Sequence, residues 1–252
     1  MKNRVNCSWL ETKGIAHRGF HNNIDAPENS IKAFERAIEL GYAIELDIHI
    51  LLDNNIVVFH DDNLKRLTGI DKLIEDCTYD EISNLNLQDS QEKIPLFKDV
   101  LTLVDGKVEL LIELKNRGKA GRLEKKTYDL LKQYRGEYAI QSFNPFSVGW
   151  FYNNAPSVIR GQLSGSYRKE KLSLVTKFLL KNLLLNSVSK PDFINYEIKY
   201  LDSFPVKLQK LRGKLILGWT AKSEEEYKEA LHYCSNVVFE GFEIKVIDHC
   251  NK

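Results

Sequence analysis

The sequence predicts an α/β protein of the (β/α)8, or TIM-barrel, class, and three observations lead to this prediction. Short apolar strands alternate with helical segments along the chain. In the stretch 43–50, Glu45 and Asp47 lie on one face of a strand whose other face is wholly aliphatic. Charged and titratable residues gather where the first strands end, and that is the end at which barrel enzymes carry their chemistry.

The individual elements follow from residue patterns. Period-two or continuous apolar runs predict eight main strands, at 15–19, 43–50, 108–115, 138–143, 158–163, 193–196, 215–220 and 236–240. Helical spacing predicts helices at 31–41, 96–105, 121–133, 145–153, 171–185, 203–211 and 224–233. The run 56–59 extends the second unit, and residues 1–13 form a lead-in segment.

The first helix also has boundary signals. Asn29 or Ser30 is suited to the N-cap and Gly41 to the C-cap. The polar, weakly periodic stretch at about 62–96 is interpreted as an inserted subdomain. We therefore expect a single TIM-barrel domain over residues 1–252, with a small insertion after the strand of the second β/α unit.

Composition limits the classes of function. The chain has 252 residues and a formal net charge of +1, so nothing favours a nucleic-acid partner. The cysteines are scattered without a CxxC pair, which favours free thiols in a reducing compartment; they are Cys7, Cys77, Cys234 and Cys250. Without an apolar leader or a membrane-spanning run, the expected location is the cytoplasm.

The acidic residues of the second strand predict a cation site. Two carboxylates side by side on the inner face of a buried strand repel each other unless a cation or a proton compensates their charge. A hard divalent cation held by carboxylate oxygens provides that compensation. At the ends of neighbouring strands lie further acids and bases: His17 and Arg18 on the first, His60 after the extension, and Glu113 and Lys115 on the third.

An ordered set of motifs resembles the glycerophosphodiester phosphodiesterase family, in particular its soluble bacterial members. The set comprises His17-Arg18-Gly19, Pro27-Glu28-Asn29-Ser30, Glu45-x-Asp47, Asp53, His60-Asp61, Leu64-x-Arg66-x-Thr68-Gly69 and Glu113-x-Lys115. Gln141-Ser142-Phe143 and Trp219-Thr220 extend it more thinly. The resemblance implies a TIM barrel with an insertion after the second unit.

The resemblance also implies residue roles. Glu45, Asp47 and Glu113 match the ligands of one divalent cation, Mg or Ca. His17 and His60 match the general acid and base, in an order that the sequence leaves open. Arg18 and Lys115 match positions near the phosphate of a small-molecule glycerophosphodiester substrate, and Trp219 is expected to form a pocket wall.

The chain also departs from the family pattern. Many members end the last strand with Thr-Asp followed shortly by Pro, whereas this chain has Phe239-Glu240-Gly241-Phe242. The departure leaves the catalytic set intact but bears on the substrate pocket.

Two alternatives to glycerophosphodiester hydrolysis remain: lysophospholipase D activity on the same fold, and a barrel that binds a phosphodiester without turnover. The leucine- and lysine-rich run 169–186 is the sequence support for the first, because such a helix can rest on a membrane. The favoured interpretation is an ordinary outer helix or subunit contact, packed by Leu172, Val175, Leu179 and Leu183. His49 is expected at the surface, and His21 is a substrate contact or a bystander. The oligomeric state is unknown.

Overall fold

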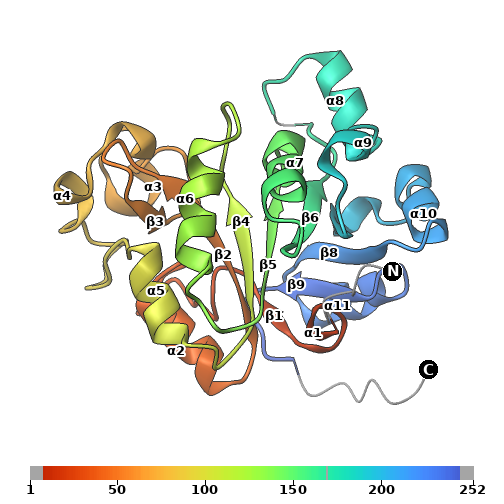
Figure 1. Cartoon of the computed structure of the whole chain (residues 1–252). Helices are drawn as coiled ribbons and strands as arrows, with labels where there is room; N and C mark the ends of the chain where they lie inside the picture. The colour runs from red at the N-terminus through yellow and green to blue at the C-terminus, as the bar shows by residue number, and fades with distance from the viewer. Residues whose placement is uncertain (1–7, 169, 245–252) are drawn as a thin grey trace.

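The computed structural model describes residues 8–168 and 170–244. Its parallel strands form a closed ring, because β1 pairs with both β2 and β9. The strands of the ring are β1 (Ile15–Ala16), β2 (Ala43–Ile50), β4 (Leu110–Leu114), β5 (Tyr138–Ser142), β6 (Ile159–Ser164), β7 (Phe193–Glu197), β8 (Leu215–Ala221) and β9 (Asn236–Phe239) (Figure 1). The predicted (β/α)8 barrel is confirmed.

The helices lie between successive strands near their predicted positions. They are α2 (Ile31–Glu39), α5 (Phe97–Val104), α6 (Arg122–Leu131), α7 (Pro145–Asn154), α8 (Leu174–Lys181), α9 (Asn186–Ser189), the 3-10 helix η2 (Ile198–Tyr200), α10 (Phe204–Leu211) and α11 (Glu224–Leu231). Ser30 is the N-cap of α2, where its side chain accepts a hydrogen bond from the Ala33 N–H. The largest difference is at the predicted helix 171–185, where α8 covers only Leu174–Lys181 and the separate α9 begins after Leu185, because Leu183 adopts a positive φ of 56°.

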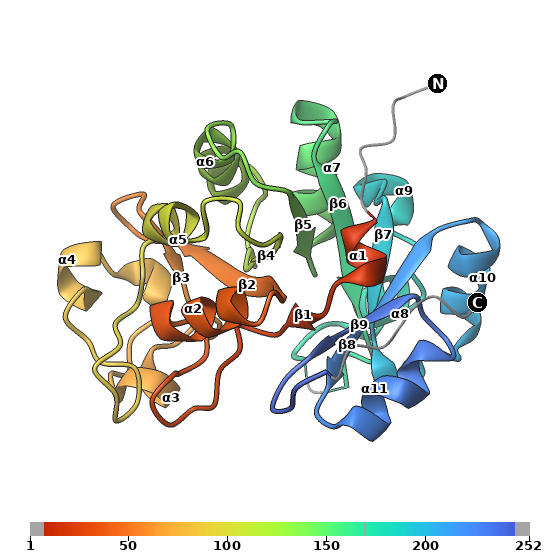
Figure 2. The same cartoon turned by 90° about the horizontal axis from the view of Figure 1, so that it is seen from below.

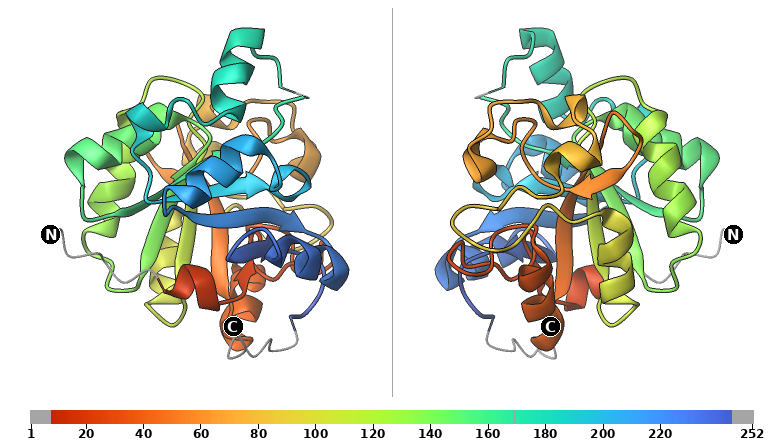
Figure 3. Two further views of the ribbon diagram at one scale, coloured as in Figure 1. Left: turned by 90° about the vertical axis from the view of Figure 1, so that its right-hand side faces the viewer. Right: turned by 90° about the vertical axis from the view of Figure 1, so that its left-hand side faces the viewer.

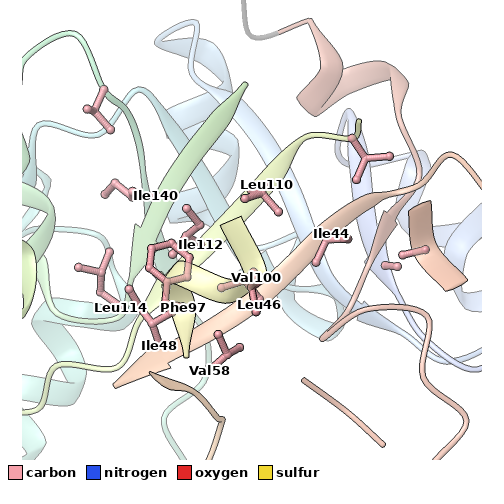
Figure 4. Packing of buried hydrophobic residues seen from close by; sticks show 14 of the residues in the cluster. Ile44, Leu46, Ile48, Val58, Phe97, Val100, Leu110, Ile112, Leu114 and Ile140 are labelled. Carbon is pink, nitrogen blue, oxygen red and sulfur yellow. The ribbon is translucent and has the colours of Figure 1, made fainter. Parts of the chain in front are cut away.

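Alternate residues of each strand face opposite sides of the barrel wall. One set faces the helices, where aliphatic side chains of β2, β4 and β5 pack on Phe97 and Val100 of α5 (Figure 4). The other set forms a separate apolar cluster with a member from each strand of the ring: Ile15, Ala43, Leu111, Ala139, Ile159, Phe193, Leu217 and Val238. This second set, here called the inner apolar layer, fills the barrel below the site.

The predicted lead-in 1–13 contains a helix that the sequence pattern did not reveal. The short helix α1 (Trp9–Thr12) buries Trp9 and Leu10 against the inner apolar layer. It lies next to β9 (Figure 2). Asn236 of β9 holds it there by donating hydrogen bonds to the carbonyls of Leu10, at 3.0 Å, and Lys13, at 2.7 Å. Residues 1–7 lie outside the described part of the chain.

The stretch 62–96 contains only short elements. They are α3 (Lys65–Thr68), η1 (Ile74–Asp76) and α4 (Tyr79–Ile82). Their buried side chains share a cluster, distinct from the barrel core, with Val57 and Phe59 at the strand β3 (Ile56–Val58), which pairs antiparallel with β2. That this stretch is an inserted subdomain stays a prediction.

In the described residues, no helix is both long enough and apolar enough to cross a bilayer. Cys77 is a buried free thiol, and Cys234 is buried as well. Cys7 and Cys250 lie outside the described residues.

Candidate active site

The polar site lies one step above the inner apolar layer. A strand side chain points to the same side as the side chain two residues away. The residues two positions beyond the inner apolar layer therefore point into the barrel. On β6 this residue is Gly161. On the other strands it is a polar or aromatic residue: His17, Glu45, Glu113, Gln141, Asn195, Trp219 and Glu240. A cavity of about 80 Å³ at this level is lined by all of them except Glu240, and also by Arg18, His60, Lys115 and Phe143.

Glu45, Asp47 and Glu113 converge, and Glu45 and Glu113 line the cavity. Each offers a carboxylate oxygen, and these oxygens lie within 4.8 Å of one another. The parallel register of β2 and β4 explains the convergence, because it places Asp47 directly beside Glu113. The Lys115 ammonium lies 2.8 Å from Glu113 Oε1 and 3.4 Å from Asp47 Oδ1.

The acids of this cluster differ in pKa. Burial, and then the charges of Asp47 and Glu113, raise the pKa of Glu45 well above its usual value. Burial also raises the pKa of Glu113. The pKa of Asp47 is held far below its usual value, because Lys115, His60, Arg18 and Asn29 outweigh the effect of burial. The cluster as a whole therefore needs further positive charge or a proton.

The three acids fit a hard divalent cation. Asp47 Oδ1 is buried and makes no hydrogen bond, so it has a free lone pair within the cluster. Its other oxygen accepts a hydrogen bond of 2.9 Å from Asn29 Nδ2, which fixes the carboxylate. An all-oxygen, anionic donor set is the one that Mg²⁺ and Ca²⁺ prefer.

His17 and His60 both line the cavity, and each has a carboxylate on its Nδ1 atom. His17 Nδ1 contacts Glu240 Oε2. His60 Nδ1 lies 2.6 Å from Asp61 Oδ1. A carboxylate on Nδ1 keeps the proton on that nitrogen and leaves Nε2 for proton transfer.

The two histidines differ in their surroundings. Burial lowers the pKa of His17 to about 4, against an opposing effect of the hydrogen bond to Glu240. Burial alone would raise the pKa of Glu240, but the hydrogen bond from His17 and the nearby His21 and Lys222 hold it well below its usual value. At neutral pH, His17 is therefore a neutral imidazole and Glu240 is a carboxylate. The side chain of His60 is 31% exposed, compared with 16% for His17.

The stretch 62–96 stabilises the loop after β1 through Arg66. This guanidinium forms two hydrogen bonds with Glu28, at 2.7 and 2.9 Å, and two with Asp61, at 2.6 and 2.9 Å. Glu28 also accepts a 2.7 Å hydrogen bond from Arg18. Arg18 lies 3.3 Å from Asp47 through its Nε atom. Asp61, which contacts His60, is thus connected to the acid cluster through Arg66, Glu28 and Arg18.

The other half of the cavity is neutral. Asn195 Nδ2 donates to Gln141 Oε1 at 3.0 Å, and Gln141 Nε2 donates to Glu45 Oε1 at 3.4 Å. Phe143 packs edge-on against Trp219, with ring centroids 5.5 Å apart. The Trp219 indole N–H donates to the Ser164 carbonyl at 3.1 Å. An apolar wall therefore faces the charged cluster.

Two expectations change on inspection of the structure. His49 is fully buried, so the expectation of a surface position is wrong; β3 and η1 cover this end of β2, and His49 Nε2 donates to the His60 carbonyl at 3.3 Å. Glu240 was noted only as a departure from the pattern, yet it contacts His17, and His21 Nε2 lies 3.7 Å from its Oε2. Counting two residues from Val238 would have placed Glu240 inside the barrel.

Comparisons with known proteins are consistent with this geometry. A family model described as the glycerophosphoryl diester phosphodiesterase family matches residues 17–239. A glycerophosphodiester phosphodiesterase of Caldanaerobacter subterraneus is 35% identical over 165 residues, covering 61% of this chain and 67% of that protein. A human lysophospholipase D is 33% identical over 140 residues, covering 50% of this chain and 43% of that protein.

Among solved structures, an Oleispira antarctica phosphodiesterase in complex with the product sn-glycerol-3-phosphate superimposes with a TM-score of 0.76. Its sequence is 24% identical, and the match covers 92% of this chain and 93% of that one. This likeness concerns the fold.

Proposed function

The chain belongs to the glycerophosphoryl diester phosphodiesterase family, and from this membership we propose that it hydrolyses glycerophosphodiesters to glycerol 3-phosphate and an alcohol. The observation that carries the proposal is the pairing of two carboxylate-bound histidines with an acid cluster around one cavity. A phosphodiester is anionic and resists attack, so its hydrolysis needs both charge neutralisation and proton transfer. A barrel that only binds the diester would not need two proton-transfer groups.

Glu45, Asp47 and Glu113 would hold one divalent cation, Mg²⁺ or Ca²⁺. When bound, such a cation supplies positive charge that offsets the charge on the phosphoryl oxygens. Arg18 and Lys115 line the same cavity and add two fixed positive charges for the phosphate. Their ion pairs with the acid cluster keep both cations in place before the substrate arrives.

For proton transfer, we assign His17 as the base and His60 as the acid. His17 is neutral near pH 7, and its Nδ1–H is directed to Glu240, so its Nε2 carries the lone pair that takes a proton from the nucleophile. With the base assigned to His17, His60 is left to give a proton to the leaving alkoxide; it is the more exposed of the two and lies against Asp61. The nucleophile is either the substrate's own glycerol hydroxyl or water.

The test is hydrolysis of glycerophosphocholine and lysophosphatidylcholine side by side, with added Mg²⁺ or Ca²⁺ and with a chelator. Metal-dependent release of glycerol 3-phosphate from glycerophosphocholine is the expected result. Binding of glycerophosphocholine without turnover would contradict the proposal and support the non-catalytic barrel.

A second candidate function is lysophospholipase D activity. The relative of that name and the apolar wall of Phe143 and Trp219 favour it, because an acyl chain needs apolar surface near the phosphate. In the assay above, this candidate requires faster turnover of lysophosphatidylcholine than of glycerophosphocholine.

We also propose that the protein works in the cytoplasm. The free thiol of Cys77 suits a reducing compartment. Fractionation of the native cells tests this location.

A further inference from the structure

Helix α8 has an apolar composition but packs almost nothing against the barrel. None of its residues is buried, whereas α10, of the same length, buries Pro205, Val206 and Gln209. Leu174, Val175 and Phe178 are 85%, 68% and 61% exposed. Both views of Figure 3 show α8, in teal, standing away from the barrel. The expectation that Leu172 and Val175 pack as in an ordinary outer helix is therefore wrong. Of the four residues expected to pack, only Leu183 is buried.

Helix α8 lies at the same end of the barrel as the candidate site. The Ser164 hydroxyl, at the end of β6, donates to the Leu180 carbonyl at 2.9 Å. The Tyr196 hydroxyl of β7 donates to the Lys181 carbonyl at 2.9 Å. These contacts attach the C-terminal turn of α8 to the ends of two barrel strands and leave its N-terminal turns projecting.

Aromatic rings continue from the cavity into the loop that precedes α8. Tyr167, in the loop between β6 and α8, packs edge-on against Phe143 with ring centroids 6.1 Å apart. Phe143 in turn packs on Trp219, and both line the cavity. A molecule with its phosphate at the acid cluster and an alkyl chain along these rings would extend toward α8.

The charges around α8 indicate what covers its apolar face. Arg168 and Lys171 precede the helix and Lys177 and Lys181 belong to it, while Glu170 is the one acid between residues 170 and 181. In a two-fold dimer formed through this face, the cations of one copy would lie against the same cations of the other, and the like charges would repel. An anionic lipid surface matches both features, since it accepts apolar side chains at the acyl boundary and attracts the cations at the headgroups.

We propose that α8 is a docking element for an anionic lipid surface, through which the enzyme meets phosphodiesters carrying an acyl chain. Leu174, Val175 and Phe178 enter the headgroup region, and the flanking cations contact the lipid phosphates. The docking itself stands on α8 alone, whereas the choice of substrate rests on the proposed phosphodiesterase activity.

The test compares two matched double variants of the full chain. Leu174→Ser/Phe178→Ser removes the exposed apolar residues of α8, and Phe204→Ser/Leu211→Ser removes two that are 76% and 84% exposed on α10. Binding is measured by co-sedimentation with vesicles of equal parts phosphatidylcholine and phosphatidylglycerol, and with vesicles of phosphatidylcholine alone.

We expect the wild type and the α10 variant to bind the anionic vesicles more strongly than the neutral ones, and less strongly as salt is added. The α8 variant should bind at least about tenfold more weakly, because each substitution removes a large side chain from the interface. Equal binding of the α8 variant and the wild type, or no binding by the wild type, would overturn the proposal. A wild-type dimer that the α8 variant lacks would instead assign the face to a second copy.

Activity separates this proposal from the proposed function. The α8 variant should hydrolyse soluble glycerophosphocholine at the wild-type rate and lose turnover of lysophosphatidylcholine presented in anionic vesicles. If no form of the protein hydrolyses either compound while the vesicle binding differs as expected, the proposed function fails and the docking element stands.

Discussion

The two halves of the barrel mouth are built in different ways. The charged half is formed by β1, β2, β4 and the stretch 62–96. It joins Arg18, Glu28, Asp47, Arg66 and Lys115 in a continuous set of ion pairs. The neutral half, formed by β5 to β8, presents amides and aromatic rings. The comparison teaches that the groups with shifted pKa values are concentrated where the chemistry is proposed, while the neutral half supplies surface for the rest of the substrate. Substitutions in the first half should lower kcat, and those in the second should raise KM.

The largest effect is expected for the histidine pair. His17→Ala and His60→Ala should each lower kcat roughly 10²- to 10⁴-fold with little change in KM, because proton transfer is needed only in the transition state. The losses should not add in the double variant, since both act on one reaction. A p-nitrophenyl diester, whose leaving group needs no proton, should restore turnover to His60→Ala and not to His17→Ala. The opposite pattern of rescue would reverse the assignment of acid and base.

The next effect concerns the acid cluster. Glu45→Gln should lower kcat about 10²- to 10³-fold, because a cation in such a site supplies several kcal/mol of charge stabilisation. The thermal unfolding temperature in chelator should stay level or rise, since the pKa of Glu45 is raised and the neutral amide relieves the repulsion that raises it. Added Mg²⁺ or Ca²⁺ should raise the unfolding temperature of the wild type and not of the variant. Wild-type turnover in chelator would remove the metal from the mechanism.

A smaller effect is expected for Glu240, which contacts His17 across the end of β9. Glu240→Gln should lower kcat/KM about 10- to 100-fold, because the amide no longer fixes the proton on Nδ1. The acid limb of kcat/KM reports the base of the free enzyme, and activity falls as the pH drops through the pKa of His17, about 4. Glu240 raises that pKa, so its removal should move the limb to lower pH. Lys222→Gln is the matched control, since Lys222 contacts the other oxygen of Glu240 at 2.7 Å; a full loss there would assign the effect to charge balance.

The smallest effect tests the neutral half. Trp219→Ala should raise KM about tenfold for a substrate with an acyl chain and leave kcat nearly unchanged, because the ring contributes contact area and no proton. Trp219→Phe keeps an aromatic wall and should behave almost as the wild type. A large fall in kcat for Trp219→Ala would erase the proposed difference between the two halves.

The sequence could predict the barrel because its strands and helices carry clear periodicities. The acids of β2 and β4 could be placed together because parallel strands align their ends, and the structure has Asp47 beside Glu113. Contacts set by loops could not be predicted in this way. Arg66 reaches Glu28 from a stretch of weak periodicity, and the burial of His49 depends on the covering by β3 and η1. An apolar helical pattern also does not tell whether another element covers the helix. Helix α8 is an example, because it is apolar and none of its residues is buried.

The hydrogen bonds between Asn236 and the segment of α1 have a consequence for how the chain folds during synthesis. Leu10 and Asn236 are 226 positions apart, and β1 has its second hydrogen-bonding partner only in β9. On the ribosome, the inner apolar layer and the pairing of β1 with β9 therefore stay incomplete until β9 has emerged. The inner apolar layer around Trp9 is exposed throughout this period. Growth temperature and chaperone supply govern whether exposed apolar surface aggregates, so they should set the yield of the recombinant protein.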